Sequence, residues 1–162
     1  MEETKHFFVS YSHLDDDFAL KLAADLKNIG VSIWIDRFDG IGLSPSEDWR
    51  KTIEMAITKD NANALISVIS PNYINSKYCM KEIARADRLD IPIIPVLLQD
   101  IEDDSWPLEI EREQYADFSN WTNKNNYGIE FDKLKSTISK KFSKERLFFS
   151  RSLRDHFKNI RK

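Results

Sequence analysis

The sequence contains a single cysteine, so the chain cannot form an internal disulfide or offer a metal ion several thiolates. Proteins that do without disulfides are typical of a reducing compartment, and we therefore expect a cytoplasmic protein. No run approaches the roughly 20 apolar residues of a membrane-spanning helix, and the acidic N-terminal stretch is unlike a signal peptide. These absences predict a protein that is neither membrane-embedded nor secreted.

Several motifs of common enzyme classes are absent as well. No G-x-G-x-x-G or Walker A loop follows an apolar run, and the sequence contains no G-x-S-x-G elbow. The three histidines, His6, His13 and His156, do not have the spacing of metal ligands, so we expect no metal site. The sequence therefore argues against a P-loop enzyme, a serine hydrolase of the elbow type and a zinc enzyme.

The charge of the chain is unevenly distributed. Its 162 residues are 41% apolar and 31% charged, which fits one globular domain. The net charge of −3 divides into −10 over residues 1–139 and +7 over residues 140–162. Because an acidic body does not attract nucleic acid, we expect no direct nucleic-acid binding. We expect one domain over residues 1–142, followed by a basic helical extension or linker over residues 143–162.

The basic extension carries a helical pattern of its own. Its apolar residues recur at intervals of 4, 4 and 3 positions, at Phe149, Leu153, Phe157 and Ile160. An amphipathic helix of this kind packs on the rest of the protein or leads into a further domain, and this is the interpretation we favour. The alternative is that it binds a membrane surface or an acidic partner.

Apolar runs separated by turn signals predict five strands that alternate with helices. The expected strands cover residues 7–12, 31–36, 64–70, 91–98 and 114–118. Alternating strands and helices with right-handed crossovers produce a parallel sheet. The sequence therefore predicts an α/β protein with a flavodoxin-like three-layer fold. Its central parallel five-stranded sheet has the order 2-1-3-4-5, with helices on both faces.

Polar residues mark where the predicted helices begin. Residues 44–47, with the sequence Ser-Pro-Ser-Glu, have the order of a capping box with proline at the first helical position. Ser76 is expected to cap the following helix, and residues 15–17, three aspartates, are expected to cap and charge the first. Trp49 and Met55 fall at helical spacing and are predicted to lie in the core.

Ligand sites in parallel sheets form beyond the carboxyl ends of the strands. The segments expected there are residues 13–17, 37–43 and 71–78. A phosphoacceptor receiver domain shares this fold and places carboxylates in the first of these segments. It also needs an aspartate after the third strand and a lysine after a later one, and the sequence has neither around Ser70 or Gln99. We therefore exclude that class.

The segment NSKYCMKEIARA, residues 75–86, contains Glu82, the carboxylate that we consider as a candidate catalytic group. On a helix, Cys79, Ile83 and Ala86 fall on one stripe, which predicts that they are buried, and Glu82 falls at the edge of that stripe. A glutamate there is most often structural and paired with a lysine or arginine. The alternative is a partly desolvated carboxylate that reaches a cleft and acts on a cationic reacting centre. The segment alone favours the structural interpretation.

Taken in order, the motifs resemble a Toll/interleukin receptor (TIR) domain over about residues 5–142. FFVSYS at 7–12 is similar to the first-strand box of that family, and WID at 34–36 begins a similar second strand and BB loop. IPIIPVLL at 91–98 matches the fourth strand. The most specific part is SPNYINSKYCMKEI at 70–83, which resembles the S-x-x-Y-x-x-S-x-W-C-x-x-E stretch of prokaryotic and plant members.

The resemblance implies one of two functions. Some TIR domains are non-catalytic scaffolds that signal through TIR–TIR contacts. Others, common in bacteria, cleave NAD⁺ between nicotinamide and ribose to give ADP-ribose or a cyclic variant, so that NAD⁺ is a substrate and no cofactor is needed. The enzymatic members use a glutamate that aligns with Glu82. The aromatic residue four positions earlier aligns with Tyr78, where most of them have tryptophan.

The resemblance also implies further site residues and an assembly. Four residues are expected near the substrate or at the ends of the BB loop: Ser12, His13, Asp36 and Trp49. The BB loop, residues 37–49, carries Ser-Pro-Ser where many members have Pro-Gly. TIR enzymes act in immune and anti-phage signalling, often with a sensor domain, when neighbouring copies stack through this loop. We therefore expect a self-assembling NAD⁺-cleaving enzyme, with the scaffold as the alternative.

Overall fold

The structure, a computed structural model, describes residues 5–35, 47–110 and 115–142, and of residues 47–50 and 52 it describes the backbone alone. Most of the predicted BB loop and the whole basic extension lie outside these residues. Within the described ranges, no helix is both long enough and apolar enough to cross a membrane.

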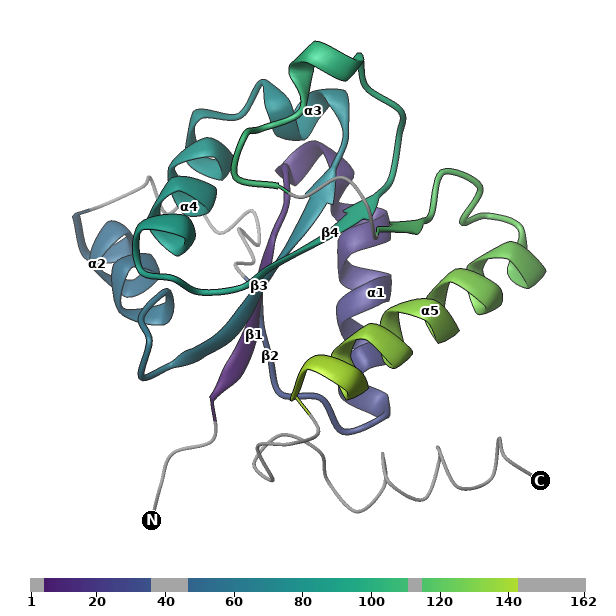
Figure 1. Cartoon of the computed structure of the whole chain (residues 1–162), viewed down its shortest axis with the longest axis horizontal. Helices are drawn as coiled ribbons and strands as arrows, with labels where there is room; N and C mark the ends of the chain where they lie inside the picture. Colours follow the sequence, from purple (N-terminus) through teal and green to yellow (C-terminus); the bar gives the residue numbers. More distant parts are fainter. Residues whose placement is uncertain (1–4, 36–46, 111–114, 143–162) are drawn as a thin grey trace.

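A five-stranded sheet with the order β2-β1-β3-β4-β5 forms the centre of the molecule, and each neighbouring pair is parallel (Figure 1). This confirms the predicted fold and strand order. The strands are β1 (His6–Ser10), β2 (Ile33–Ile35), β3 (Ala62–Ile69), β4 (Ile93–Leu97) and β5 (Ala116–Asp117). They are shorter than predicted at several ends. The first strand ends before Ser12 because that residue caps a short 3₁₀ turn, η1 (His13–Asp15).

Helices cover both faces of the sheet (Figure 1). One face carries α1 (Asp16–Asn28) and α5 (Lys124–Phe142), and the other carries α2 (Glu47–Ala56), α3 (Pro71–Ile74) and α4 (Lys77–Arg88). A second 3₁₀ turn, η2 (Asp103–Ser105), follows β4. Two apolar cores result, one on each face of the sheet.

The first strand shows how one stretch of sequence serves both cores. Because side chains alternate along a strand, Phe7 and Val9 face the core under α1 and α5, whereas Phe8 faces the core under α2 and α4. Phe8 stacks there on Trp34 of β2, with ring centroids 4.7 Å apart. By the same alternation, Ser10 faces the side of the sheet that α4 covers.

Two serines cap helices next to the sheet. Ser76 accepts a hydrogen bond from the Cys79 amide at 3.3 Å, as predicted for the start of α4. Ser70 accepts one from the Tyr73 amide at 3.1 Å and begins α3, which carries Pro71 at its first position. The two caps therefore fix where α3 and α4 begin, beyond the carboxyl end of β3.

The predicted role of the three aspartates at residues 15–17 is only partly right. Asp15 occupies the capping position of α1 but makes no side-chain cap bond. Its carboxylate instead accepts hydrogen bonds from Ser70 Oγ at 2.5 Å and from Asn72 Nδ2 at 2.9 Å. Asp16 and Asp17 do lie in the first turn of α1, where negative charge favours the helix dipole.

The prediction that Met55 lies in the core is wrong, because the side chain is 67% exposed. On α2, Ile53 and Ala56 face the sheet, and Met55 lies about 200° around the helix from Ile53. The predicted start of this helix, at residues 44–46, lies outside the described residues, as does the side chain of Trp49.

Candidate functional site

Helix α4 buries the stripe that its sequence predicts. Cys79, Ile83 and Ala86 are 2%, 1% and 0% exposed, and all three belong to the core between the sheet and this helix. Glu82 is partly buried, as expected for the edge of that stripe. Its carboxylate therefore lies between the core and the solvent, next to the carboxyl end of β1.

A buried chain of hydrogen bonds reaches the Glu82 carboxylate. Ser10 Oγ donates to Glu82 Oε2 at 2.5 Å, and Ser10 Oγ lies 2.8 Å from the Tyr73 hydroxyl. A serine hydroxyl has one proton, so when Ser10 donates it to an ionised Glu82 the Tyr73 hydroxyl is the donor to Ser10. Ser10 is 1% exposed and Tyr73 is fully buried. We call this chain, from Tyr73 through Ser10 to Glu82, the carboxylate relay.

The surroundings of Glu82 keep the neighbouring acids protonated. Burial raises the pKa of Tyr73 well above its usual value, and the charges of Cys79 and Glu82 act in the same direction. Burial also raises the pKa of Cys79 to about 12, and the charge of Glu82 adds to that effect. Tyr73 is therefore a neutral donor at physiological pH, and Cys79 is an unreactive core thiol rather than a nucleophile.

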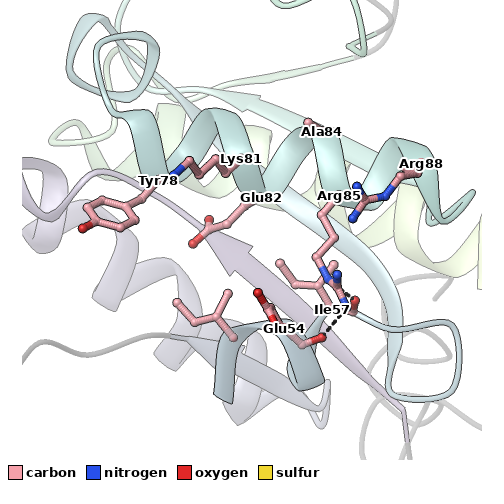
Figure 2. A pocket seen from close by; sticks show the side chains of 9 residues that line it. Glu54, Ile57, Tyr78, Lys81, Glu82, Ala84, Arg85 and Arg88 are labelled. Carbon is pink, nitrogen blue, oxygen red and sulfur yellow. Dashed lines mark hydrogen bonds between the residues drawn. The ribbon is translucent and has the colours of Figure 1, made fainter. Parts of the chain in front are cut away.

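Glu82 lines a pocket of about 370 Å³ between α2 and α4. This volume lies near the lower end of the range for small-molecule sites, which is about 300–1,000 Å³. Figure 2 shows Tyr78 and Glu82 projecting from α4, and both residues line this pocket. The lining residues are Ile53, Glu54, Ile57, Tyr78, Lys81, Glu82, Ala84, Arg85 and Arg88.

Arg85 joins the two helices that form this pocket. Its Nε donates to the Ile57 carbonyl at 2.9 Å, and its Nη2 donates to the Glu54 carbonyl at 2.7 Å (Figure 2). These carbonyls lie at the C-terminal end of α2, where a cation is favoured by the helix dipole. The guanidinium group thus fixes the distance between α2 and α4.

Of the other predicted site residues, the structure describes the side chains of Ser12 and His13, and these two do not line the Glu82 pocket. Ser12 caps the turn η1 by accepting from the Leu14 amide at 3.3 Å, and exposed His13 stacks on Tyr11 with ring centroids 5.4 Å apart. Neither is among the described residues that line the pocket. Asp36 and the side chain of Trp49 lie outside the described part of the chain. Roles in substrate binding for all four stay predictions.

The sequence prediction missed Ser10, Tyr73 and Arg85. Ser10 ends a strand in which it follows three apolar residues at positions 7–9, and buried hydroxyl groups usually have a hydrogen-bond partner. That signal was present, but the partner could not be read from the sequence, because Glu82 lies 72 positions away. Arg85 gave no signal, since arginine is common on exposed helix faces.

The parallel sheet, the helices on both faces and the site beyond β1 and β3 define a three-layer α/β domain. Residues 7–134 match the model of the TIR domain family, and the chain therefore belongs to that family. The chain is also 34% identical, over 85 residues, to the 2′ cyclic ADP-D-ribose synthase BtTIR of Bacteroides thetaiotaomicron. The matched region covers 51% of this chain and 28% of that protein, so the chain corresponds to a minor part of that relative.

Solved structures of other TIR domains have the same fold. The TIR domain of the Toll-related receptor TRR-2 from Hydra magnipapillata superposes with a TM-score of 0.61 at 23% identity, covering 83% of this chain and 98% of that one. A metazoan TIR-STING receptor from C. gigas gives a TM-score of 0.57 at 20% identity, covering 83% and 41%. At such identities the likeness concerns the fold alone.

Proposed function

We propose that this TIR domain cleaves the bond between nicotinamide and ribose in NAD⁺, with Glu82 as the catalytic carboxylate. The observation that carries the proposal is the Glu82 carboxylate, held by a buried serine and set beside the Tyr78 ring in a pocket. The similarity to a protein named as a cyclic ADP-ribose synthase supports the same reaction class. The products would be nicotinamide with ADP-ribose or a cyclic variant.

The reaction needs stabilisation of positive charge more than it needs an acid. As the bond between C1′ of the ribose and the nicotinamide nitrogen breaks, its electron pair neutralises the cationic nicotinamide ring. The ribose is left with oxocarbenium character, which the Glu82 carboxylate stabilises. Water then adds to C1′ and loses a proton, giving ADP-ribose, or a hydroxyl of the same molecule adds and gives a cyclic product.

Tyr78 supports the proposal as an aromatic neighbour of the carboxylate. Its ring offers a flat apolar surface against which the nicotinamide can stack, and such contacts contribute about 0.5–1.5 kcal/mol beyond the area they bury. Ser12, His13, Asp36 and Trp49 are proposed to contact the remainder of the NAD⁺ molecule. The proposal treats NAD⁺ as the substrate and involves no other cofactor.

The biological setting that we propose is bacterial immune or anti-phage signalling in the cytoplasm. Activity would be switched on when copies of the domain assemble through TIR–TIR contacts, with the BB loop (residues 37–49) of one copy completing the site of the next. A sensor domain or partner protein would supply the trigger. Deletion of residues 40–43 is expected to abolish activation by assembly, and full activation of the deletion variant would contradict this part of the proposal.

Nicotinamide release is the direct test. The chain is incubated with NAD⁺ at high concentration and with a crowding agent, which promotes assembly, and nicotinamide is measured by liquid chromatography. Glu82→Gln is expected to lower kcat about a hundredfold or more, because losing one charge interaction in the transition state costs about 3 kcal/mol. Asp87→Asn on the exposed side of the same helix is the matched control and should leave kcat unchanged.

The possible results separate the two functions. An assembled wild type that releases no nicotinamide would leave the scaffold as the better function for this chain. Equal release by the wild type and Glu82→Gln would keep the enzyme but reject Glu82 as its carboxylate. Release by the wild type alone, with Asp87→Asn active, is the outcome that the proposal requires.

A further inference from the structure

The carboxylate relay has a direction that bears on the state of Glu82. The chain of donors runs from Tyr73 to Ser10 and from Ser10 to Glu82 Oε2, so the glutamate end accepts. A carboxylate accepts such a bond readily, and a bond from a neutral donor to a charged acceptor is stronger than one between neutral groups. The chain can therefore deliver a donor to the Glu82 carboxylate without leaving either hydroxyl proton unpaired.

The opposite direction would be unfavourable. If Glu82 carried a proton on Oε2 and donated it to Ser10, the Ser10 proton would have two destinations. It would go to the Cys79 sulfur, which is a weak acceptor, or to Tyr73, whose own proton would then need another acceptor. Within the described residues, Ser10 is the one hydrogen-bond partner of that hydroxyl, and Tyr73 is fully buried. A buried hydroxyl proton without an acceptor costs about 1–3 kcal/mol. Tyr73 thus biases the whole chain toward the direction that ends on a carboxylate.

Each member of the relay is held in place by the fold. Ser10 lies on β1, which is hydrogen-bonded on both sides, to β2 and to β3. Tyr73 lies on α3, whose start is fixed by Ser70. Neither side chain can turn into solvent, so the donor that meets Glu82 has a fixed position.

From this geometry we propose that Ser10 and Tyr73 are positioning residues, which hold the Glu82 carboxylate ionised and in one orientation toward the pocket. Neither residue needs to touch the substrate. The inference builds on the proposed function, because it assigns to the two buried hydroxyls the support of the proposed catalytic group. It concerns the turnover step rather than the affinity for NAD⁺.

Kinetics of three variants test this role. Ser10→Ala removes the donor and is expected to lower kcat about tenfold to a hundredfold, in line with the loss of a charge-assisted hydrogen bond, with KM within about twofold of the wild type. Tyr73→Phe keeps the ring and should lower kcat about threefold to tenfold. Ser10→Thr keeps the hydroxyl and should restore most of the activity that Ser10→Ala loses.

Ser67→Ala is the matched control. Ser67 is the register partner of Ser10 on β3 and is equally buried, and its hydroxyl has no hydrogen-bond partner among the residues that the structure describes. Its replacement should change neither kcat nor KM, and thermal unfolding of every variant reports whether it is folded. A Ser10→Ala variant that is folded and keeps the kcat of the wild type would overturn the inference, as would a loss in Ser67→Ala as large as that in Ser10→Ala.

A second measurement does not depend on activity. The carboxyl carbon of Glu82, assigned with Glu82→Gln, is titrated by NMR in the wild type and in Ser10→Ala. Loss of the donor should move the midpoint to higher pH, because the ionised form has lost its hydrogen bond. The other titratable and charged groups that line the pocket or act on its buried neighbours are the same in both proteins: Glu54 on α2, Tyr73 on α3, and Tyr78, Cys79, Lys81, Arg85 and Arg88 on α4.

The two measurements keep the two proposals apart. A wild type that releases no nicotinamide would contradict the proposed function, and the titration would still decide whether the relay holds the carboxylate. An unchanged midpoint in Ser10→Ala would overturn the relay even if the wild type were an active enzyme. Lower kcat, unchanged KM and a raised midpoint together would support it.

Discussion

Tyr78 faces the same pocket as Glu82, yet 48% of its surface remains in solvent. Because the ring lines the pocket and is open to solvent, contact with a ligand is the role that we propose for it. Most enzymatic relatives are expected to have tryptophan here. If stacking is its role, the area of the ring, and not the hydroxyl, determines what Tyr78 contributes.

Substitutions at Tyr78 test this. Tyr78→Ala should lower kcat/KM for NAD⁺ cleavage about tenfold, because a stacking contact of about 1 kcal/mol and the apolar area of the ring are both lost. Tyr78→Trp should preserve or increase kcat/KM. Steady-state assays with purified variants measure both. A Tyr78→Ala variant as active as the wild type would show that the ring does not contact the substrate.

At the level of residues, the sequence predicts which side chains are buried, because burial follows the helical period. The spacing of Cys79, Ile83 and Ala86 predicted burial, and the structure confirmed it. The relay partners of Glu82 were missed because hydrogen bonds between distant segments leave no periodic mark. A buried polar residue such as Ser10 usually has a hydrogen-bond partner, but the sequence does not identify which residue that partner is.

Two helices, α2 and α4, form the pocket, and one side chain holds them together. Arg85 donates to two carbonyls at the end of α2, so its guanidinium satisfies acceptors that the helix itself cannot. The planar group is suited to two parallel contacts of this kind, whereas lysine has a single ammonium group. The width of the pocket thus depends on an arginine at this position.

Arg85→Lys is expected to destabilise the protein by about 1 kcal/mol, because at least one of the two hydrogen bonds is lost. Arg88→Lys makes the same change one turn further along, at an exposed position, and should alter stability by less than about 0.5 kcal/mol. Urea unfolding followed by circular dichroism compares the two. Equal midpoints for both variants would refute a clamp between α2 and α4.

The ends of helices and strands could be predicted where neighbouring residues in the sequence determine them. Ser76 capped α4 as expected, because a serine before a helical pattern satisfies a free amide. The strand order 2-1-3-4-5 was also correct. The expected end of the first strand was wrong, since Ser12 belongs to the turn η1. Strand ends depend on pairing with neighbours, which the sequence of one strand does not contain.

At the scale of the whole molecule, the sheet separates two apolar cores, and only one of them lies next to the pocket that Glu82 lines. The core beneath α1 and α5 contains none of the residues that line the pocket. The core beneath α2, α3 and α4 includes Tyr73, Cys79 and Ile83, which lie directly behind Glu82. The stability of this second core and the geometry of the site are therefore linked.

One half-buried group, His6, and one buried group, Cys79, make the stability of the protein depend on pH. Burial lowers the pKa of His6, whose Nε2 lies 3.0 Å from the Ala56 carbonyl, although that hydrogen bond acts in the opposite direction. The unfolded chain then binds more protons below about pH 6.5, so the free energy of unfolding should fall as the pH decreases. The pKa of Cys79 rises from 9.0 to about 12, so the unfolded chain loses its proton first and stability should fall above about pH 9.

Urea unfolding at pH 5.5, 7.5 and 10 measures the free energy of unfolding and checks both the acidic and the basic decrease. His6→Gln should flatten the decrease on the acidic side. Cys79→Ala should remove about 1 kcal/mol of the decrease between pH 7.5 and pH 10, which is what a thiol with an unfolded-state pKa of 9.0 contributes at that pH. Profiles of the variants that run parallel to the wild type would show that other groups control the pH dependence.

The three aspartates at residues 15–17 differ in how strictly the fold fixes their positions. Within the described residues, Asp15 alone of the three binds across to the start of α3, through Ser70 and Asn72. A deletion of one residue before Asp15 would move a different aspartate into its place or turn the carboxylate about 120°, the angle per residue in a 3₁₀ turn such as η1. The connection between β1 and α1 is therefore expected to tolerate substitution at Asp16 and Asp17 far better than any insertion or deletion.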